Sequence, residues 1–269
     1  MSIKLNELLS FVHAIAPLGL AADWDNCGMQ IDLGREEVHK ILVALEITSA
    51  VIQEAADCGA DMIISHHPLL FNPVRNVSRD KIPGRYMIDL IQNGISVYSA
   101  HTSFDAATGG NNDYIAEKAG MKQVENLVMH LPGRDIAAFG RMGVLPETIS
   151  LFEMGERLKD TLNLHQIRLV GDPKTSIKKV AVCTGAGGRQ ELETALYNGC
   201  DLFITGDVRH HEALDALELG ICMIDAGHFG TEAIFTENFA RKLRELTGGQ
   251  VEIVESAVNT DPFNTEKYE

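Results

Sequence analysis

The spacing of apolar residues along the chain predicts an α/β protein. Apolar side chains between Leu5 and Ile15 recur at steps of three and four, the period of an amphipathic helix, and Pro17 ends the pattern. Short apolar runs then alternate with segments of helical length. In the first half we expect strands at 41–45, 62–64 and 95–99, and helices at 50–58 and 85–92. This alternation is typical of parallel strands covered by helices.

The same alternation returns after a middle region at 126–178. That region has strand candidates at 137–145 and 167–170. Between them a helix is expected at 151–162, because Ser150 and Glu153 have the spacing of a capping box. Further strands are expected at 180–184, 202–205, 221–224 and 251–254, and further helices at 190–198, 212–218 and 233–246.

Two phrases occur in both halves of the chain. ADCGADMIIS at 56–65 resembles LYNGCDLFIT at 196–205, and NGISV at 93–97 resembles LGICM at 219–223. A duplication explains this, although unrelated α/β proteins also reuse helix–glycine–strand phrases. In either case we predict two similar α/β domains, residues 1–125 and 126–269, whose ends can pack across the halves.

Composition narrows the class of protein. The 269 residues carry a net charge of −15, which repels phosphate backbones, so nucleic acid is not an expected partner. No apolar run approaches the roughly 18–20 residues that cross a bilayer, and polar residues interrupt the N-terminal segment where a secretion signal would be continuous. The five cysteines are scattered and form no C-x-x-C pair. We therefore expect a cytoplasmic protein with reduced thiols and no membrane association.

Polar clusters follow three of the predicted strands: SHHP at 65–68, HTSFD at 101–105 and DAGHFGTE at 225–232. In parallel sheets, ligands bind beyond the carboxyl ends of the strands, so these clusters can converge. His101 and Asp105 have the same spacing as His228 and Glu232.

Each residue alone has a simpler explanation. A single histidine is usually a packing residue, and either acid could cap a helix or occupy its first turn. Together, the imidazoles and carboxylates favour a site for two divalent ions that share a bridging carboxylate.

These clusters, with DWDNCG at 23–28 and TGD at 205–207 followed by His210 and His211, resemble the signature blocks of the Nif-three-like dinuclear metal-binding family. Its members are often named GTP cyclohydrolase 1 type 2. The resemblance extends from the first helix to about residues 261–263. Cys27 replaces a more usual aliphatic residue, and the long central insertion of some relatives is missing; neither departure affects a metal position.

The resemblance implies two topologically similar α/β domains with a two-metal site in the cleft between them, at the C-terminal ends of the strands. It also implies a ring-shaped homohexamer. Asp105 or Glu232 would bridge the ions. The implied metal ligands are His66, His67, Asp105, His228 and Glu232.

Proton transfer is assigned to three histidines outside the implied ligand set. His101 could be a further ligand, or it could orient Asp105 or a bound water. Asp207, His210 and His211 resemble a block that lines the pocket, but the last two could equally begin a solvated helix. The residues predicted to be catalytic are His101, His210 and His211.

We therefore expect a dinuclear metal-dependent hydrolase that acts on a small molecule. By resemblance the substrate is GTP, with hydroxide attacking C8 of the guanine ring and formate leaving. Two alternatives remain: a two-metal phosphoesterase or amidohydrolase, and a non-catalytic metal-binding scaffold. The mixed ligand set accepts Zn, Fe, Mn, Co or Ni.

Two loops have open interpretations. GAGG at 185–188 resembles a phosphate-binding turn but lacks the lysine of a P-loop, so a tight turn is the preferred interpretation. The segment 68–83 is long for a structureless connection, which suggests a lid or an oligomer contact.

Overall fold

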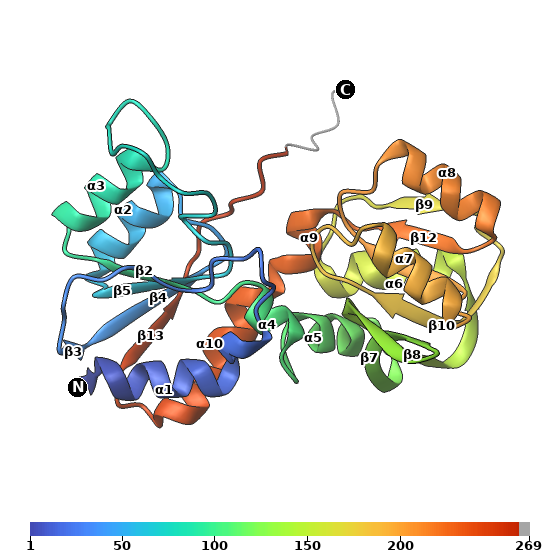
Figure 1. Cartoon of the computed structure of the whole chain (residues 1–269), viewed down its shortest axis with the longest axis horizontal. Coiled ribbons are helices and arrows are strands. Elements are labelled where there is room, and N and C mark those ends of the chain that lie inside the picture. Colours follow the sequence, from blue (N-terminus) through green and yellow to red (C-terminus); the bar gives the residue numbers. More distant parts are fainter. Residues whose placement is uncertain (264–269) are drawn as a thin grey trace. The chain divides into compact units, whose positions relative to one another are not determined.

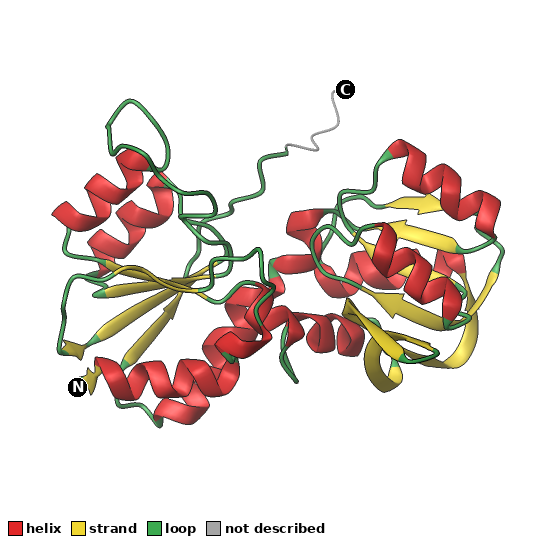
Figure 2. Ribbon diagram, in the orientation of Figure 1, coloured by secondary structure: helices red, strands yellow, loops and turns green. Residues whose placement is uncertain are grey.

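The computed structural model describes residues 1–263 and divides the chain into two compact units (Figures 1 and 2). The first unit comprises residues 1–110 and 235–260, and the second comprises residues 111–234 and 261–263. The first boundary thus falls before residue 111, whereas the sequence suggested one after 125. The reason is that Ile115 and Ala116 are buried in the core of the second unit.

The first unit contains a five-stranded sheet in the order β13-β4-β5-β6-β2. Its strands are β2 (Gly28–Ile31), β4 (Lys40–Ala44), β5 (Met62–Ser65), β6 (Ser96–Ser99) and β13 (Glu252–Glu255). All neighbours pair in parallel except β2, which is antiparallel to β6. The pairing of β13 with β4 brings the C-terminal segment back to the first unit. Two short strands, β1 (Ile3–Lys4) and β3 (Glu37–Val38), form a separate antiparallel pair.

Helices cover both faces of this sheet. The helices are α1 (Leu5–Ile15), α2 (Ser49–Cys58), α3 (Gly84–Gln92), α4 (Thr102–Ala106) and α10 (Ile234–Thr247), with a 3₁₀ turn at Leu18–Leu20. In Figure 1, α2 and α3 lie on one face, and α1 and α10 on the other. Leu42, Ile63 and Val97 pack with α2 and α3, while their neighbours Ile41 and Ile64 are equally buried. Burial on both faces explains why these strands are continuous apolar runs in the sequence.

The second unit contains a six-stranded sheet in the order β7-β8-β10-β11-β12-β9. Its strands are β7 (Lys122–Leu131), β8 (Arg134–Ser150), β9 (Arg168–Val170), β10 (Ser176–Val182), β11 (Leu202–Thr205) and β12 (Cys222–Asp225). β10, β11 and β12 are parallel, whereas β8 and β9 flank them in antiparallel pairing.

Side chains alternate between two helical layers in this unit. Its helices are α5 (Asn111–Lys118), α6 (Leu151–Leu162), α7 (Arg189–Tyr197), α8 (His210–Leu219) and α9 (His228–Glu232). Val180 and Val182 pack in the cluster that includes α5 and α6, and Ala181 packs in the cluster that includes α7 and α8. This is the two-residue period of a strand buried on both faces.

The two units repeat one order of elements, as the sequence predicted. β4-α2-β5-α3-β6 corresponds to β10-α7-β11-α8-β12, and each series has an antiparallel strand at its edge, β2 or β9. Even a polar detail recurs. Asp61 accepts hydrogen bonds from two successive backbone N–H groups at the start of β4, and Asp201 does the same in β10. In the described part of the chain, no helix is long and apolar enough to cross a membrane, and all five cysteines are free thiols.

Candidate metal centre

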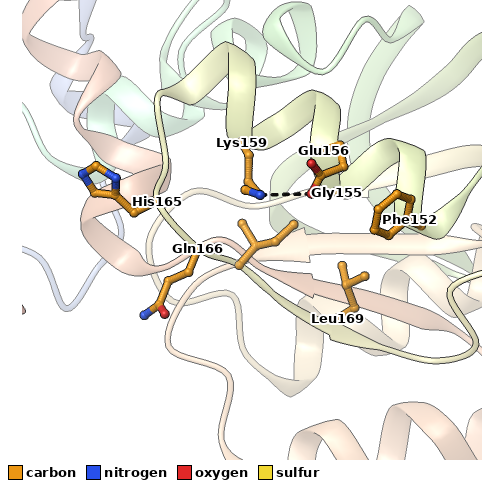
Figure 3. A pocket seen from close by; sticks show the side chains of 8 residues that line it. Phe152, Gly155, Glu156, Lys159, His165, Gln166 and Leu169 are labelled. Atoms are coloured by element: carbon orange, nitrogen blue, oxygen red, sulfur yellow. Dashed lines mark hydrogen bonds and ion pairs between the residues drawn. The ribbon is translucent and has the colours of Figure 1, made fainter. Parts of the chain in front are cut away.

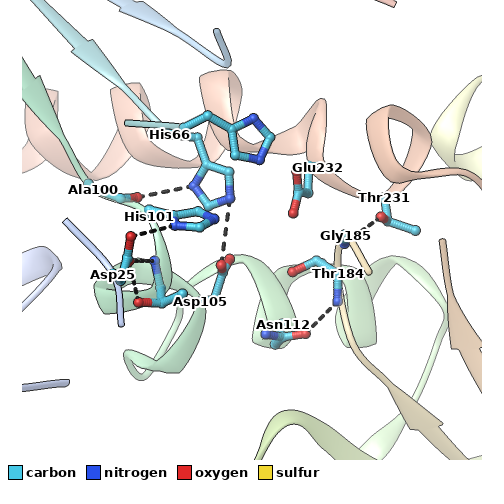
Figure 4. A network of polar contacts seen from close by, with 12 residues as sticks. Asp25, His66, Ala100, His101, Asp105, Asn112, Thr184, Gly185, Thr231 and Glu232 are labelled. Atoms are coloured by element: carbon cyan, nitrogen blue, oxygen red, sulfur yellow. Dashed lines mark hydrogen bonds and ion pairs between the residues drawn. The ribbon is translucent and has the colours of Figure 1, made fainter. Parts of the chain in front are cut away.

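Parallel strand pairing places three histidines at one edge of the first sheet. His66 and His67 follow β5 directly, and His101 follows β6 and precedes α4. Backbone hydrogen bonds continue the sheet past the strand ends, from the N–H of His66 to the carbonyl of Ala44 (3.2 Å) and from the N–H of Ala100 to the carbonyl of Ser65 (2.9 Å). The backbone is therefore fixed at the point where the histidines project (Figure 4).

Each of these imidazoles is held through its Nδ1 atom. Nδ1 of His66 lies 3.1 Å from the carbonyl oxygen of Ala100, Nδ1 of His67 lies 2.6 Å from Oε1 of Glu46, and Nδ1 of His101 lies 2.9 Å from Oδ1 of Asp25. Carbonyl and ionised carboxylate oxygens only accept hydrogen bonds, so Nδ1 is the donor in all three rings. In the neutral imidazole, the lone pair is then on Nε2, the state that a metal ligand requires.

The three rings converge. One nitrogen from each of His66, His67 and His101 can be chosen so that all three lie within 4.8 Å of one another. The ring centroids are 4.9, 5.1 and 5.2 Å apart. Uncharged imidazoles gathered at this spacing can donate to a common cation, which is the geometry of a metal site.

Asp105 adds a carboxylate to this group. It lies on α4, and its Oδ2 is 3.6 Å from Nε2 of His66, which is too long for a hydrogen bond (Figure 4). His66 is fully buried and Asp105 is 7% exposed. A lone pair that faces a buried carboxylate is unfavourable unless the ring is protonated or a cation binds both groups. The first unit therefore offers a donor set that fits a divalent metal ion.

The second unit contains a similar arrangement on α9. Nδ1 of His228 lies 2.8 Å from Oδ2 of Asp207, and its Nε2 lies 3.0 Å from Oε2 of Glu232. Glu232 is 3% exposed. His228 thus lies between two carboxylates. Asp207 contacts its Nδ1 and fixes the tautomer, and Glu232 faces its Nε2. This pair could also hold a metal ion.

A glycine keeps space for the Glu232 carboxylate. A Cβ atom at Gly185 would lie 2.2 Å from Oε1 of Glu232 and 3.3 Å from Nε2 of His228. The N–H of Gly185 donates to Oγ1 of Thr231 at 2.9 Å, which ties this turn to α9 (Figure 4). Nearby, the N–H of Gly187 donates to Oγ1 of Thr205 at 2.7 Å. Two N–H groups of the GAGG segment are used internally, in line with the tight turn that the sequence favoured.

Asp25 connects several groups around His101. Its carboxylate accepts hydrogen bonds from Nδ1 of His101, from the N–H and hydroxyl of Thr102, and from the thiol of Cys27. Burial alone would raise the pKa of Asp25, but the hydrogen bonds from His101, Cys27 and Thr102 outweigh it and hold the pKa well below its ordinary value. Asp25 is therefore ionised and keeps His101 in one orientation.

The acids that hold the histidines were not assigned this role from the sequence. The sequence pattern did not indicate Glu46, and it placed Asp25 and Asp207 only within larger blocks of the family resemblance. A usable signal existed for Glu46, because it follows β4, whose carboxyl end lies beside that of β5.

Two further features lie elsewhere in the second unit. His210 and His211, predicted to be catalytic, are exposed in the first turn of α8. A pocket of about 250 Å³ lies beside α6, where Lys159 and Glu156 form an ion pair at 3.1 Å (Figure 3). The residues that line this pocket are Phe152, Gly155, Glu156, Lys159, His165, Gln166, Ile167 and Leu169. None of the predicted site residues is among them.

Comparison with known proteins identifies the family. The family model Duf34/NIF3 (NGG1p interacting factor 3) matches residues 3–262. The "GTP cyclohydrolase 1 type 2 homolog" of Clostridium perfringens is 35% identical over 262 residues, which cover 97% of this chain and 99% of that protein. The chain belongs to the Duf34/NIF3 family.

Solved structures agree with this assignment. A Bacillus cereus protein related to NIF3 has a TM-score of 0.90 and 26% identity, with 98% of this chain and 99% of that chain covered. Reduced HcgD from Methanocaldococcus jannaschii has a TM-score of 0.80 and 29% identity, with 96% and 99% covered. The predicted family and α/β fold class are therefore confirmed.

Proposed function

We propose that this protein is a metal-dependent hydrolase of the GTP cyclohydrolase 1 type 2 kind that binds two divalent cations. Asp105 or Glu232 would be the carboxylate shared between the two cations. The proposed ligands are His66, His67, Asp105, His228 and Glu232. Zn, Fe, Mn, Co and Ni all suit such a mixed set. The proposal includes a cytoplasmic homohexamer, as the family resemblance implies.

The observation that supports this proposal most strongly is the shared anchoring of the imidazoles. His66, His67 and His228 each have Nδ1 held by a carbonyl or carboxylate oxygen. Such outer partners fix the orientation of metal-binding histidines and raise their basicity. The exposed His130 also has Nδ1 beside a carboxylate, so the anchoring supports a metal centre through its combination with the groups of imidazole and carboxylate atoms that lie close together.

The cations would supply hydroxide near neutral pH by lowering the pKa of water toward about 7. The side chains have separate tasks. Asp25 keeps Nδ1 of His101 protonated, so Nε2 is the atom that can accept a proton from water or donate one to a leaving nitrogen. His101 is therefore our first choice for proton transfer, and His210 and His211 remain predictions for the same role.

The proposed substrate is GTP, because the relatives in the comparison are named as homologues of GTP cyclohydrolase 1 type 2. Hydrolysis at C8 of the guanine ring would release that carbon as formate. The assay is formate release from GTP by protein loaded with each candidate metal. Glu232→Gln should abolish release, and Glu218→Gln, an exposed acid at the end of α8, should leave it unchanged.

Failure of this assay would have a defined meaning. If the wild-type protein released no more formate than Glu232→Gln, the cyclohydrolase proposal would be wrong. Metal-dependent turnover of a phosphoester or amide in the same preparation would then indicate the phosphoesterase or amidohydrolase alternative. Tightly bound metal without turnover of any substrate would indicate a scaffold.

A further inference from the structure

Two large aromatic side chains in the first unit lie exposed beside the histidines. Trp24 is 61% exposed and Phe71 is 49% exposed, and their ring centroids are 6.0 Å apart at an interplanar angle of 57°. They come from loops that are distant in the sequence, 23–27 and 68–83. Aromatic rings of this size are usually buried, so an exposed pair at contact distance indicates a binding surface.

Hydrogen bonds hold these two loops together. The side-chain amide of Asn26 donates to the carbonyl of Leu70 at 2.7 Å, and the N–H of Leu70 donates to Oε1 of Gln30 at 3.1 Å. Nε2 of Gln30 donates to the carbonyl of Asn26 at 2.7 Å. The residues next to Trp24 and Phe71 are thus fixed while the rings themselves remain exposed. A surface positioned in this way loses little conformational entropy when a ligand binds.

The aromatic pair is continuous with the candidate metal centre. The His101 ring lies 6.1 Å from Trp24 at 72° and 6.4 Å from Phe71 at 75°, and it is also 5.2 Å from His67. His101 therefore stands between the exposed rings and the other histidines. A planar ring stacked on Trp24 or Phe71 would meet the other ring at an angle, because the two are tilted by 57°, and it would lie near His101.

The size of this surface indicates its occupant. Two side chains are much smaller than the roughly 800 Å² per partner of a stable protein interface, but they match the face of one heteroaromatic ring. We propose that Trp24 and Phe71 bind the base of a purine nucleotide by stacking and so place it beside His101. This inference rests on the proposed function and adds the residues that would recognise its substrate.

Trp24 is the single tryptophan of the chain, so its fluorescence reports binding directly. The experiment titrates the full-length protein with GMP, AMP and, as a control without a base, ribose 5-phosphate. We expect saturable quenching by one or both nucleotides and none by ribose 5-phosphate. Phe71→Ala should weaken the affinity about 5- to 100-fold, the usual range for loss of one stacking partner, and Phe71→Tyr should restore it. Phe152→Ala, at a ring that is 55% exposed in the second unit, should have no effect.

The outcomes separate this inference from the proposed function. Nucleotide binding that depends on Phe71, without formate release from GTP, would support stacking and reject the cyclohydrolase. Formate release with an unchanged KM in Phe71→Ala, and without quenching of Trp24 by GMP or AMP, would overturn the stacking inference alone. A Phe71→Ala variant that changes the oligomeric mass but not the nucleotide affinity would also overturn it, because the pair would then be a contact between copies of the chain.

Discussion

Gly185→Ala should damage metal binding although glycine carries no ligand atom. The new Cβ would lie 2.2 Å from Oε1 of Glu232, far inside contact distance, so the carboxylate would have to move. Glu232 is 3% exposed and has little room to do so. Gly185 also has φ of +68°, so any larger residue costs roughly 1–2 kcal/mol through backbone strain alone.

A matched glycine separates these two effects. Gly199 has the same φ of +68°, but a Cβ there would have no atom within 4 Å. Gly199→Ala should therefore show the backbone strain without the displacement of Glu232. In the presence of a chelator, Gly185→Ala should lower the free energy of unfolding at least as much as Gly199→Ala, and any excess is the steric cost of displacing Glu232.

Only Gly185→Ala should lose metal affinity. We expect its metal dissociation constant to rise at least about tenfold, because disturbing an outer partner of a ligand already costs roughly 10- to 100-fold. Competition with a chromophoric chelator measures this constant for both variants and the wild-type protein. Equal metal affinities for Gly185→Ala and Gly199→Ala would refute the role that we assign to Glu232.

Three further predictions concern other parts of the chain. Glu46→Ala should weaken metal binding about 10- to 100-fold, because it releases Nδ1 of His67. The same chelator competition measures the metal dissociation constant, and an unchanged constant would show that this carboxylate is dispensable. Asp61→Asn should destabilise the first unit by about 1–2 kcal/mol at pH 7, because Asp61 accepts two backbone hydrogen bonds and pairs with an arginine. Burial would raise the pKa of Asp61, but these partners hold it below its ordinary value of 3.8. The stability difference between Asp61→Asn and the wild-type protein should therefore persist above pH 3.8 and shrink below it. Urea unfolding at several pH values tests this, and a difference that does not change with pH would contradict it. Asp113→Ala should cost about 3 kcal/mol in the second unit, because it removes the carboxylate 2.7 Å from the buried Arg141 guanidinium, and a loss below about 1 kcal/mol would contradict that estimate.

The sequence predicted the buried parallel strands well. β11 has the predicted bounds, and β5 differs by one residue, because both are apolar runs that end at a polar cluster. Less regular elements were missed. β7 is mostly exposed and has only three consecutive apolar residues, at 127–129, and α5 consists largely of polar residues.

The division into units could not be predicted from periodicity. The C-terminal segment belongs to the first unit because β13 pairs with β4, a contact between residues about 200 positions apart. Local patterns carry no information on such a pairing. The repeated phrases did predict two similar units. They contain the equivalent aspartates Asp61 and Asp201, which accept backbone hydrogen bonds at the start of β4 and in β10.

The candidate site shows the same limit. His66 and His67 could be named as candidates because they directly follow a predicted strand, and Asp105 because its spacing from His101 recurs in His228 and Glu232. Glu46 was missed, because its position after a parallel strand is a weak signal when a single acid after an apolar run is common. Its role depends on a 2.6 Å contact with a histidine 21 positions away, which only the folded chain defines.

Anomalous diffraction at the absorption edge of the bound metal tests the central claim most directly. Crystals of protein purified without chelators should show two peaks per chain, at about 2.0–2.2 Å from Nε2 atoms of His66, His67 and His228 and from the carboxylates of Asp105 and Glu232. No peak at these side chains, or a single peak, would contradict the dinuclear centre.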